Sequence, residues 1–177
     1  MGGPLRMTIC ARPARGHDRA IDRALSRAST YPHPAGRIKR IETHISVIYL
    51  AGRFAYKRMK PVDFGFVDFR RIEDRQRCCE AEVKLNEPLA GPLYRDVLPV
   101  ARRGRVCRLD PSRGRSVDYI VKMRRFDEVQ VFSTLVATRE LRADDIDRVA
   151  DRLAEYHMHS PQSGNHGIVG RDYGSAR

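Results

Sequence analysis

Residues 37–60 read RIKRIETHISVIYLAGRFAYKRMK, and their β-branched and aromatic side chains tend to recur at every second position. That period is typical of β-strands, whose successive side chains point to opposite faces. The pattern predicts three strands, RIKRIET, HISVIYLAG and RFAYKRMK, and places a tight turn at Ala51-Gly52-Arg53 between the last two. Because such short connections join strands of opposite direction, the segment predicts an antiparallel meander.

Helical patterns flank this meander. A short amphipathic helix is expected at Asp18–Ala28, before the turn Tyr31-Pro32-His33-Pro34, and a long helix at Arg70–Glu87, which Pro88 is expected to end. Further along, the patterns predict strands at Asp96–Val106 and Ser116–Met123, with a break at Arg102-Arg103-Gly104 left open, and helices at Val129–Ala137 and Asp144–His157. This order predicts an α+β fold with an antiparallel sheet of about five strands.

The same patterns divide the chain into four parts. Residues 1–30 are expected to form a lead-in with the short N-terminal helix, and residues 31–126 a sheet lobe. Residues 127–160 are expected to start a helical lobe, and residues 161–177, which show no apolar period, a disordered tail.

Composition narrows the classes of protein that this chain could belong to. It has 177 residues, and no run of about 18 apolar residues or signal-like apolar segment occurs, so a cytoplasmic protein is expected. The four cysteines lack the paired spacing of zinc sites, so we expect them to be reduced.

The net charge of +12 favours polyanionic partners. Six arginines form the densest basic stretch, and they support an alternative interpretation as a nucleic-acid-binding module: Arg102, Arg103, Arg105, Arg108, Arg113 and Arg115. A solvated hairpin is the simpler interpretation of the same residues.

Lys57 and Glu82 are the most informative pair of charged residues. Glu82 lies four residues after Cys78 and three before Leu85, on the apolar stripe of the expected helix, whereas Glu80 lies on a solvated face. A carboxylate on a buried face is costly unless it meets a cation, and Lys57, on the third strand, is the best candidate. A plain structural ion pair is the alternative to a functional one.

Several motifs follow one another in an order that resembles the aminoglycoside phosphotransferase-like family, whose members are often fused to a C-terminal P-loop ATPase. They are the YPHP turn, the ETHIS segment, the AYKRMKP strand end, the FGFVDF loop, the EVKLN helix, and the later VDYIVKMRRF and RLAEYH, at residues 31–34, 42–46, 55–61, 64–69, 82–86, 117–126 and 152–157. The resemblance spans about residues 31–161. It implies a protein-kinase-like N-lobe followed by the first helices of an incomplete C-lobe.

By this resemblance, Lys57 contacts the phosphates of ATP and Glu82 holds it in place. Met123 and Arg124 would belong to the hinge, the segment whose backbone meets the adenine. Residues 31–126 would then form the nucleotide-binding lobe. His44 and Ser46, in the ETHIS turn, would offer side-chain donors where protein kinases have a glycine-rich loop. We expect ATP binding to be weak, and magnesium not to be held by this chain alone.

The HGDxHxxN catalytic loop that such a kinase requires is not in the sequence, and no GxxxxGK[ST] motif occurs either. Asp63-Phe64-Gly65 spells the DFG triplet, but it precedes the expected helix, so we expect a structural loop, with Phe64, Phe66 and Phe69 packed under the sheet. Three interpretations stay open: a catalytically incomplete, truncated kinase-fold protein, a basic binding module, and a fragment without independent function. The third would leave apolar helix faces for a missing C-terminal lobe or for self-association.

Overall fold

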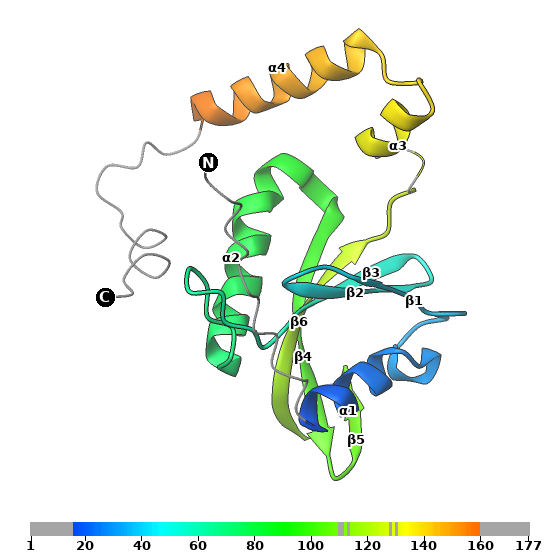
Figure 1. Cartoon of the computed structure of the whole chain (residues 1–177), viewed down its shortest axis with the longest axis vertical. Coiled ribbons are helices and arrows are strands. Elements are labelled where there is room, and N and C mark those ends of the chain that lie inside the picture. Colours follow the sequence, from blue (N-terminus) through cyan, green and yellow to red (C-terminus); the bar gives the residue numbers. More distant parts are fainter. Residues whose placement is uncertain (1–15, 110–111, 113, 128, 130, 160–177) are drawn as a thin grey trace, which may run out of the picture.

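The computed structural model describes residues 16–109, 112, 114–127, 129 and 131–159 (Figure 1). Its elements, in chain order, are α1 (Gly16–Leu25), a 3-10 turn η1 (Ala28–Thr30), β1 (Lys39–Glu42), β2 (Ser46–Ala51), β3 (Phe54–Met59), α2 (Ile72–Ala90), η2 (Gly91–Leu93), β4 (Tyr94–Arg103), β5 (Val106–Arg108), β6 (Arg115–Arg124), α3 (Phe132–Ala137) and α4 (Ala143–His159). The predicted lead-in before residue 16, the tail after residue 159 and Cys10 lie outside the described residues.

The six strands form one curled antiparallel sheet in the order β1-β2-β3-β6-β4-β5. The predicted meander is confirmed, since β2 pairs with both β1 and β3. β6 returns beside β3, so the last long strand lies in the centre of the sheet. The α+β class is confirmed, but the sheet has six strands where about five were expected. The extra strand arises at Gly104, whose φ of 59° turns the chain from β4 into β5.

Each face of the sheet carries its own apolar cluster. One cluster includes α1 residues and faces that helix, and its largest buried members are Ile21, Leu25, Tyr49, Tyr56, Val100 and Ile120. The other lies under α2 and includes Leu50, Ala55, Met59, Cys79, Val121 and Met123. Alternate residues of β3 and β6 serve the two clusters, as the two-residue period of a strand requires.

A buried network of charges joins the two helices to the sheet. The carboxylate of Asp118, on β6, accepts a bond from Arg58 Nε of β3 at 2.6 Å and from Arg75 Nε of α2 at 2.7 Å. Arg58 also pairs with Asp18 of α1. Two guanidinium groups therefore face two carboxylates, and the network carries no net charge.

Pro88 lies inside α2, which continues to Ala90, so the prediction that it ends the helix is wrong. Pro88 is two residues from the end of the helix, and it removes only one hydrogen bond, the one that a backbone N–H at this position would donate to the Lys84 carbonyl. Gly91 ends the helix instead, with a φ of 51° and its N–H bonded to the Glu87 carbonyl. Figure 1 shows α2 bending toward its C-terminal end.

α3 and α4 follow β6 and lie beyond the sheet (Figure 1). Neither helix has a buried residue, and Ile146, Val149 and Leu153 of α4 are exposed. α4 is held to α2 by Arg152, which donates to the Pro88 carbonyl at 2.9 Å. No described helix is both long and apolar enough to cross a membrane.

Candidate functional site

Lys57 and Glu82 meet on the face of the sheet that α2 covers. Lys57 Nζ donates to both carboxylate oxygens of Glu82, at 2.8 and 2.9 Å. The two side chains are 23% and 13% exposed, so water screens this pair less than a surface pair. The predicted ion pair is confirmed.

The sheet register explains why Lys57 reaches α2. In the central strand β3 it lies between Ile48 of β2 and Val121 of β6, and its neighbours two residues away, Ala55 and Met59, are buried under the same helix. Glu80, in contrast, is exposed and accepts a bond from Gln76 at 2.8 Å, so the predicted difference between the two helix faces also holds.

Tyr94, the first residue of β4, completes the cluster. Its hydroxyl donates to Glu82 Oε1 at 3.4 Å, and burial raises the pKa of Tyr94 to about 12. Tyr94 therefore remains a neutral donor beside the carboxylate at ordinary pH. Tyr94 was not among the predicted site residues, because the strand was predicted to begin at Asp96. A bulge separates the two positions in the β4–β6 register.

The arrangement leaves Lys57 with bonding capacity. A lysine ammonium has three N–H donors, and the two bonds to Glu82 use two of them. The carboxylate fixes the direction of the ammonium group, and its remaining N–H can bind an oxyanion. Such a held lysine is suited to contact a phosphate oxygen as a point charge.

Two further predicted site residues share this face of the sheet. Met123 lies opposite Ala55 in the β3–β6 register, and Ser46 lies opposite Met59 in the β2–β3 register. Because side chains alternate along a strand, both are on the side of Lys57. Arg124 ends β6 opposite Phe54 and is exposed, and the following residue, Arg125, donates its N–H to the Arg53 carbonyl at 2.9 Å.

The ETHIS turn between β1 and β2 is built by its own hydroxyl groups. Thr43 Oγ1 and Ser46 Oγ lie 2.8 Å apart, and the Ser46 N–H donates to Thr43 Oγ1 at 3.0 Å. Ser46 is buried, whereas His44 is exposed at the turn. Lys60 adds a cation here, since its Nζ donates to the Thr43 carbonyl at 2.6 Å. Lys60 Nζ also lies 2.6 Å from Glu42 Oε1, so the charged or titratable groups at this turn are the exposed imidazole of His44 and a Lys60–Glu42 ion pair.

The Asp63-Phe64-Gly65 segment forms a closed loop, as expected. Asp63 Oδ1 accepts the N–H of Gly65 at 2.9 Å, and the Phe64 N–H donates to the Val67 carbonyl at 3.0 Å. Of the phenylalanines around this loop, Phe69 is buried but Phe66 is 61% exposed, so the expectation that all of them pack under the sheet is wrong. Within the described ranges, no group of three or more metal-binding side chains occurs.

The comparison with known proteins gives relatives without an assigned role. Three curated mycobacterial proteins, each named only as uncharacterized, are 34% identical to this chain over 122 residues: Rv2004c and MT2060 of Mycobacterium tuberculosis and Mb2027c of Mycobacterium bovis. The match covers 69% of this chain and 23% of each relative, so the chain spans about a quarter of the curated relatives that it matches. No family model matches the chain, and no solved structure matches it.

Proposed function

We propose that this chain is the nucleotide-binding lobe of a protein-kinase-like fold, of the aminoglycoside phosphotransferase-like kind. The observation that carries the proposal is the pair of bonds from Lys57 Nζ to the Glu82 carboxylate, at 2.8 and 2.9 Å, between a central strand and the helix above it. Kinases hold their phosphate-contacting lysine in this way.

The order of the elements supports the proposal independently of the pair. A three-stranded meander is followed by a long helix, and the last long strand then returns beside the third strand of the meander. The lysine lies on that third strand and the glutamate on the helix. The motifs that resemble the family occur at the same elements, from the YPHP turn before β1 to RLAEYH in α4.

In the proposed complex, the nucleotide lies at the face of the sheet that carries Lys57. The third N–H of Lys57 binds an oxygen of the α- or β-phosphate, and Glu82 and Tyr94 keep the ammonium in place. The adenine ring meets the backbone around Met123 and Arg124, where β6 ends. The exposed ring of His44 is a further donor toward the phosphates.

The proposal concerns binding and not transfer. Phosphoryl transfer needs an Asp that orients the acceptor and a metal-holding Asn and Asp, and the sequence contains no HGDxHxxN motif. With no such groups at the γ-phosphate, ATP and ADP should bind with similar affinity, and magnesium should change that affinity little. We expect the purified chain to transfer no phosphate to an aminoglycoside or a sugar.

Calorimetric titration of the full chain with ATP and ADP, with and without magnesium, tests the proposal. Lys57→Met should weaken both nucleotides about tenfold, which corresponds to about 1.4 kcal/mol. Lys84→Met, which removes an exposed lysine of α2, is the matched control and should leave both affinities unchanged.

Two results would overturn the proposal. One is the absence of any nucleotide binding by the wild-type chain, and the other is an equal loss in the two lysine variants. If ATP with magnesium bound far more tightly than ADP, the expected flat preference would be wrong, and Asp63 and Asp68 would become candidate metal ligands.

A further inference from the structure

The charged residues of this chain are divided between two ends of the molecule. The basic end consists of α1 and the β4–β5 hairpin, which lie together, and α4 lies at the opposite end (Figure 1). Residues 16–30 contain three arginines and two aspartates, and residues 97–117 contain six arginines and one aspartate. α4 carries five carboxylates and two arginines. At the basic end, arginines therefore outnumber the carboxylates of the same segments three to one.

The two carboxylates of α1 are already used inside the fold. Asp18 pairs with the buried Arg58 of β3. Asp22 accepts a bond from Arg40 Nε at 2.9 Å and another from the Tyr49 hydroxyl at 2.6 Å. These bonds direct both acids toward the sheet, so the exposed side of the helix is left to its arginines. Residues 1–15, which precede α1 in the sequence, add three more arginines and no carboxylate.

Three exposed arginines follow one another at intervals of four residues, two on α1 and one just past its end: Arg19, Arg23 and Arg27. Within the part of the chain that the structure describes, none of the three takes part in an ion pair. Arg19 and Arg23 are one helical turn apart, where like charges repel and cost stability. Arg108 of β5 lies nearby, because its Nη1 donates to the Ser29 carbonyl at 3.0 Å. The fold thus places like charges next to one another on an exposed surface.

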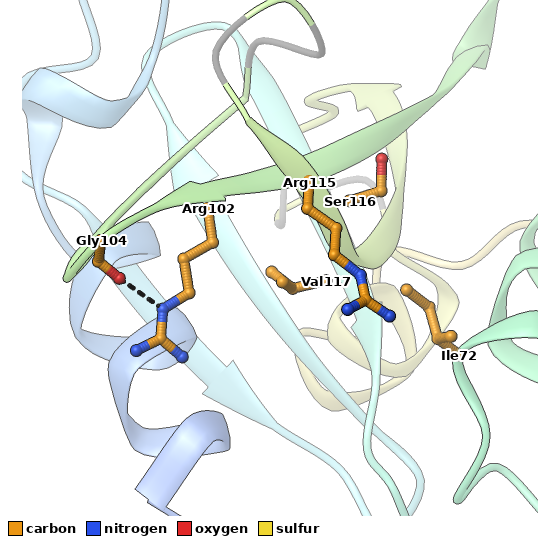
Figure 2. Close-up of a pocket in the computed structure, with 6 residues that line it drawn as sticks. All are labelled: Ile72, Arg102, Gly104, Arg115, Ser116 and Val117. Atoms are coloured by element: carbon orange, nitrogen blue, oxygen red, sulfur yellow. Dashed lines mark hydrogen bonds between the residues drawn. The ribbon is translucent and has the colours of Figure 1, made fainter.

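The arginines of the hairpin differ in what they contact. Arg102 is half-buried, and its Nε donates to the Gly104 carbonyl at 2.8 Å (Figure 2). Its guanidinium group is thereby held within the hairpin, beside a cavity of about 490 Å³ that Arg115 also lines. Arg103 and Arg105, at the turn of the hairpin, are exposed instead. Contacts to a large partner therefore fall to the exposed arginines of the turn and of α1.

The remaining side chains of the basic end select among anionic partners. α1 buries its apolar residues against the sheet, and Val106 is the single large exposed apolar side chain of α1 and β5. These elements therefore lack the apolar face with which a helix enters a membrane surface. They also contain no Phe, Tyr or Trp, so they offer no stacking platform for the bases of a single strand. Spaced arginines match the regular phosphates of a duplex, which proteins contact without reading sequence.

We propose that the basic end binds the phosphate backbone of double-stranded nucleic acid, without sequence preference. Each exposed guanidinium group binds phosphate oxygens through its planar fork. The acidic α4, at the other end, is repelled by the same polyanion and so orients the molecule on it. This surface is independent of the proposed nucleotide site, because Lys57 lies on the face of the sheet that α2 covers, and α1 covers the other face.

Fluorescence anisotropy tests this surface, with a labelled DNA duplex of about 20 base pairs titrated with the full chain at several salt concentrations. Arg19→Gln, Arg23→Gln and Arg27→Gln should each weaken binding about tenfold near about 50 mM salt. Each should also reduce the slope of log affinity against log salt by about 0.9, since one phosphate contact is lost. A DNA duplex of unrelated sequence and an RNA duplex should bind with similar affinity, because the contacts go to phosphates.

Arg95→Gln is the matched control for these variants. Arg95 is an exposed arginine near the start of β4, and the strand carries it roughly 20 Å from Arg102. The substitution removes the same charge far from α1, so it should change neither the affinity nor the salt dependence. Arg23→Lys keeps the charge and should bind the duplex nearly as the wild type does.

A melting experiment without nucleic acid separates binding from folding. Arg23→Gln should melt at the wild-type temperature or higher, because glutamine forms helix about as well as arginine and its introduction relieves the repulsion from Arg19. A lower melting temperature would show that Arg23 serves the fold and not a partner.

Several binding results would overturn the proposal. Absence of duplex binding at low salt would remove the surface, and an equal loss in Arg95→Gln would mean that binding follows overall charge. Equal binding to phosphatidylserine vesicles, with the same losses in the α1 variants, would indicate a membrane surface. Tighter binding to a single strand, or to one duplex sequence, would indicate contacts to bases. Loss of duplex binding in Lys57→Met would place the nucleic acid at the proposed nucleotide site, whereas failure of ATP binding alone would leave this surface intact.

Discussion

Glu80 and Glu82 show how two residues with the same side chain differ through their position on one helix. Glu82 turns toward the sheet, is 13% exposed and accepts two bonds from Lys57. Glu80 turns toward solvent and bonds to Gln76, another residue of α2. Only the first carboxylate neutralises a cation that is partly removed from water, so only its loss leaves a charge without a partner.

We therefore predict that Glu82→Ala costs about 2 kcal/mol of stability, because Lys57 is then left half-buried and unpaired. Glu80→Ala should change stability by less than about 0.5 kcal/mol, as exposed substitutions usually do. Chemical denaturation of both variants in the same buffer measures the difference. Equal losses would mean that the Lys57–Glu82 pair adds nothing to the folded state.

For single residues, the sequence was informative where a charged side chain lies at an otherwise apolar position. Glu82 was found because a carboxylate on an apolar stripe demands a cation. Asp118 offered the same signal, since it lies among apolar residues of β6, but its partners could not be inferred from the sequence. They come from β3 and α2, and their approach depends on how the sheet curls. Tyr94 gave no such signal, because an aromatic residue at a strand end is ordinary.

Among the elements, the strands were predicted more accurately than the helix ends. The alternation of β2 and β3 is local, so the sequence alone specifies it. The end of α2 depends on Gly91, whose positive φ of 51° turns the chain out of the helix three residues after the proline. The return of β6 to the side of β3 is a long-range pairing, and the order of the elements did not determine it.

Asp118 of β6 connects three other elements of the fold. Its carboxylate binds arginines from β3 and α2, and the β3 arginine, Arg58, also binds Asp18 of α1. We predict that Asp118→Asn costs about 3 to 5 kcal/mol, because two buried guanidinium groups lose their shared counter-charge. Glu155→Gln, in an exposed pair with Arg152, is the control and should cost less than about 1 kcal/mol. Urea denaturation measures both, and a loss for Asp118→Asn no larger than for the control would contradict the network's role.

On the scale of the whole molecule, the tyrosines of the α1 side report on the intact core. Burial raises the pKa of Tyr31 and of Tyr49 well above the ordinary value, and raises the pKa of Tyr56 to about 12. Each hydroxyl also has a partner within the fold: Tyr31 donates to the Leu25 carbonyl at 2.5 Å, Tyr49 to Asp22 at 2.6 Å, and Tyr56 lies 2.8 Å from His33 Nε2. Through Tyr31 and His33, the YPHP turn therefore hydrogen-bonds to both α1 and β3 at this core.

These shifts predict how stability depends on alkaline pH. An unfolded tyrosine ionises near pH 10, whereas the buried ones keep their protons to about pH 12 or beyond, so the folded state binds more protons between these values. The stabilising contribution is therefore complete below about pH 10 and falls as the pH rises toward 12, by up to about 1.4 kcal/mol per pH unit for each such tyrosine. Urea denaturation at several pH values measures the fall, and phenolate absorbance should rise abruptly with unfolding.

Tyr56→Phe is the control for this prediction and should make the fall of stability with pH shallower. If the phenolate signal instead grew smoothly near pH 10 in the folded protein, these tyrosines would not be buried as described.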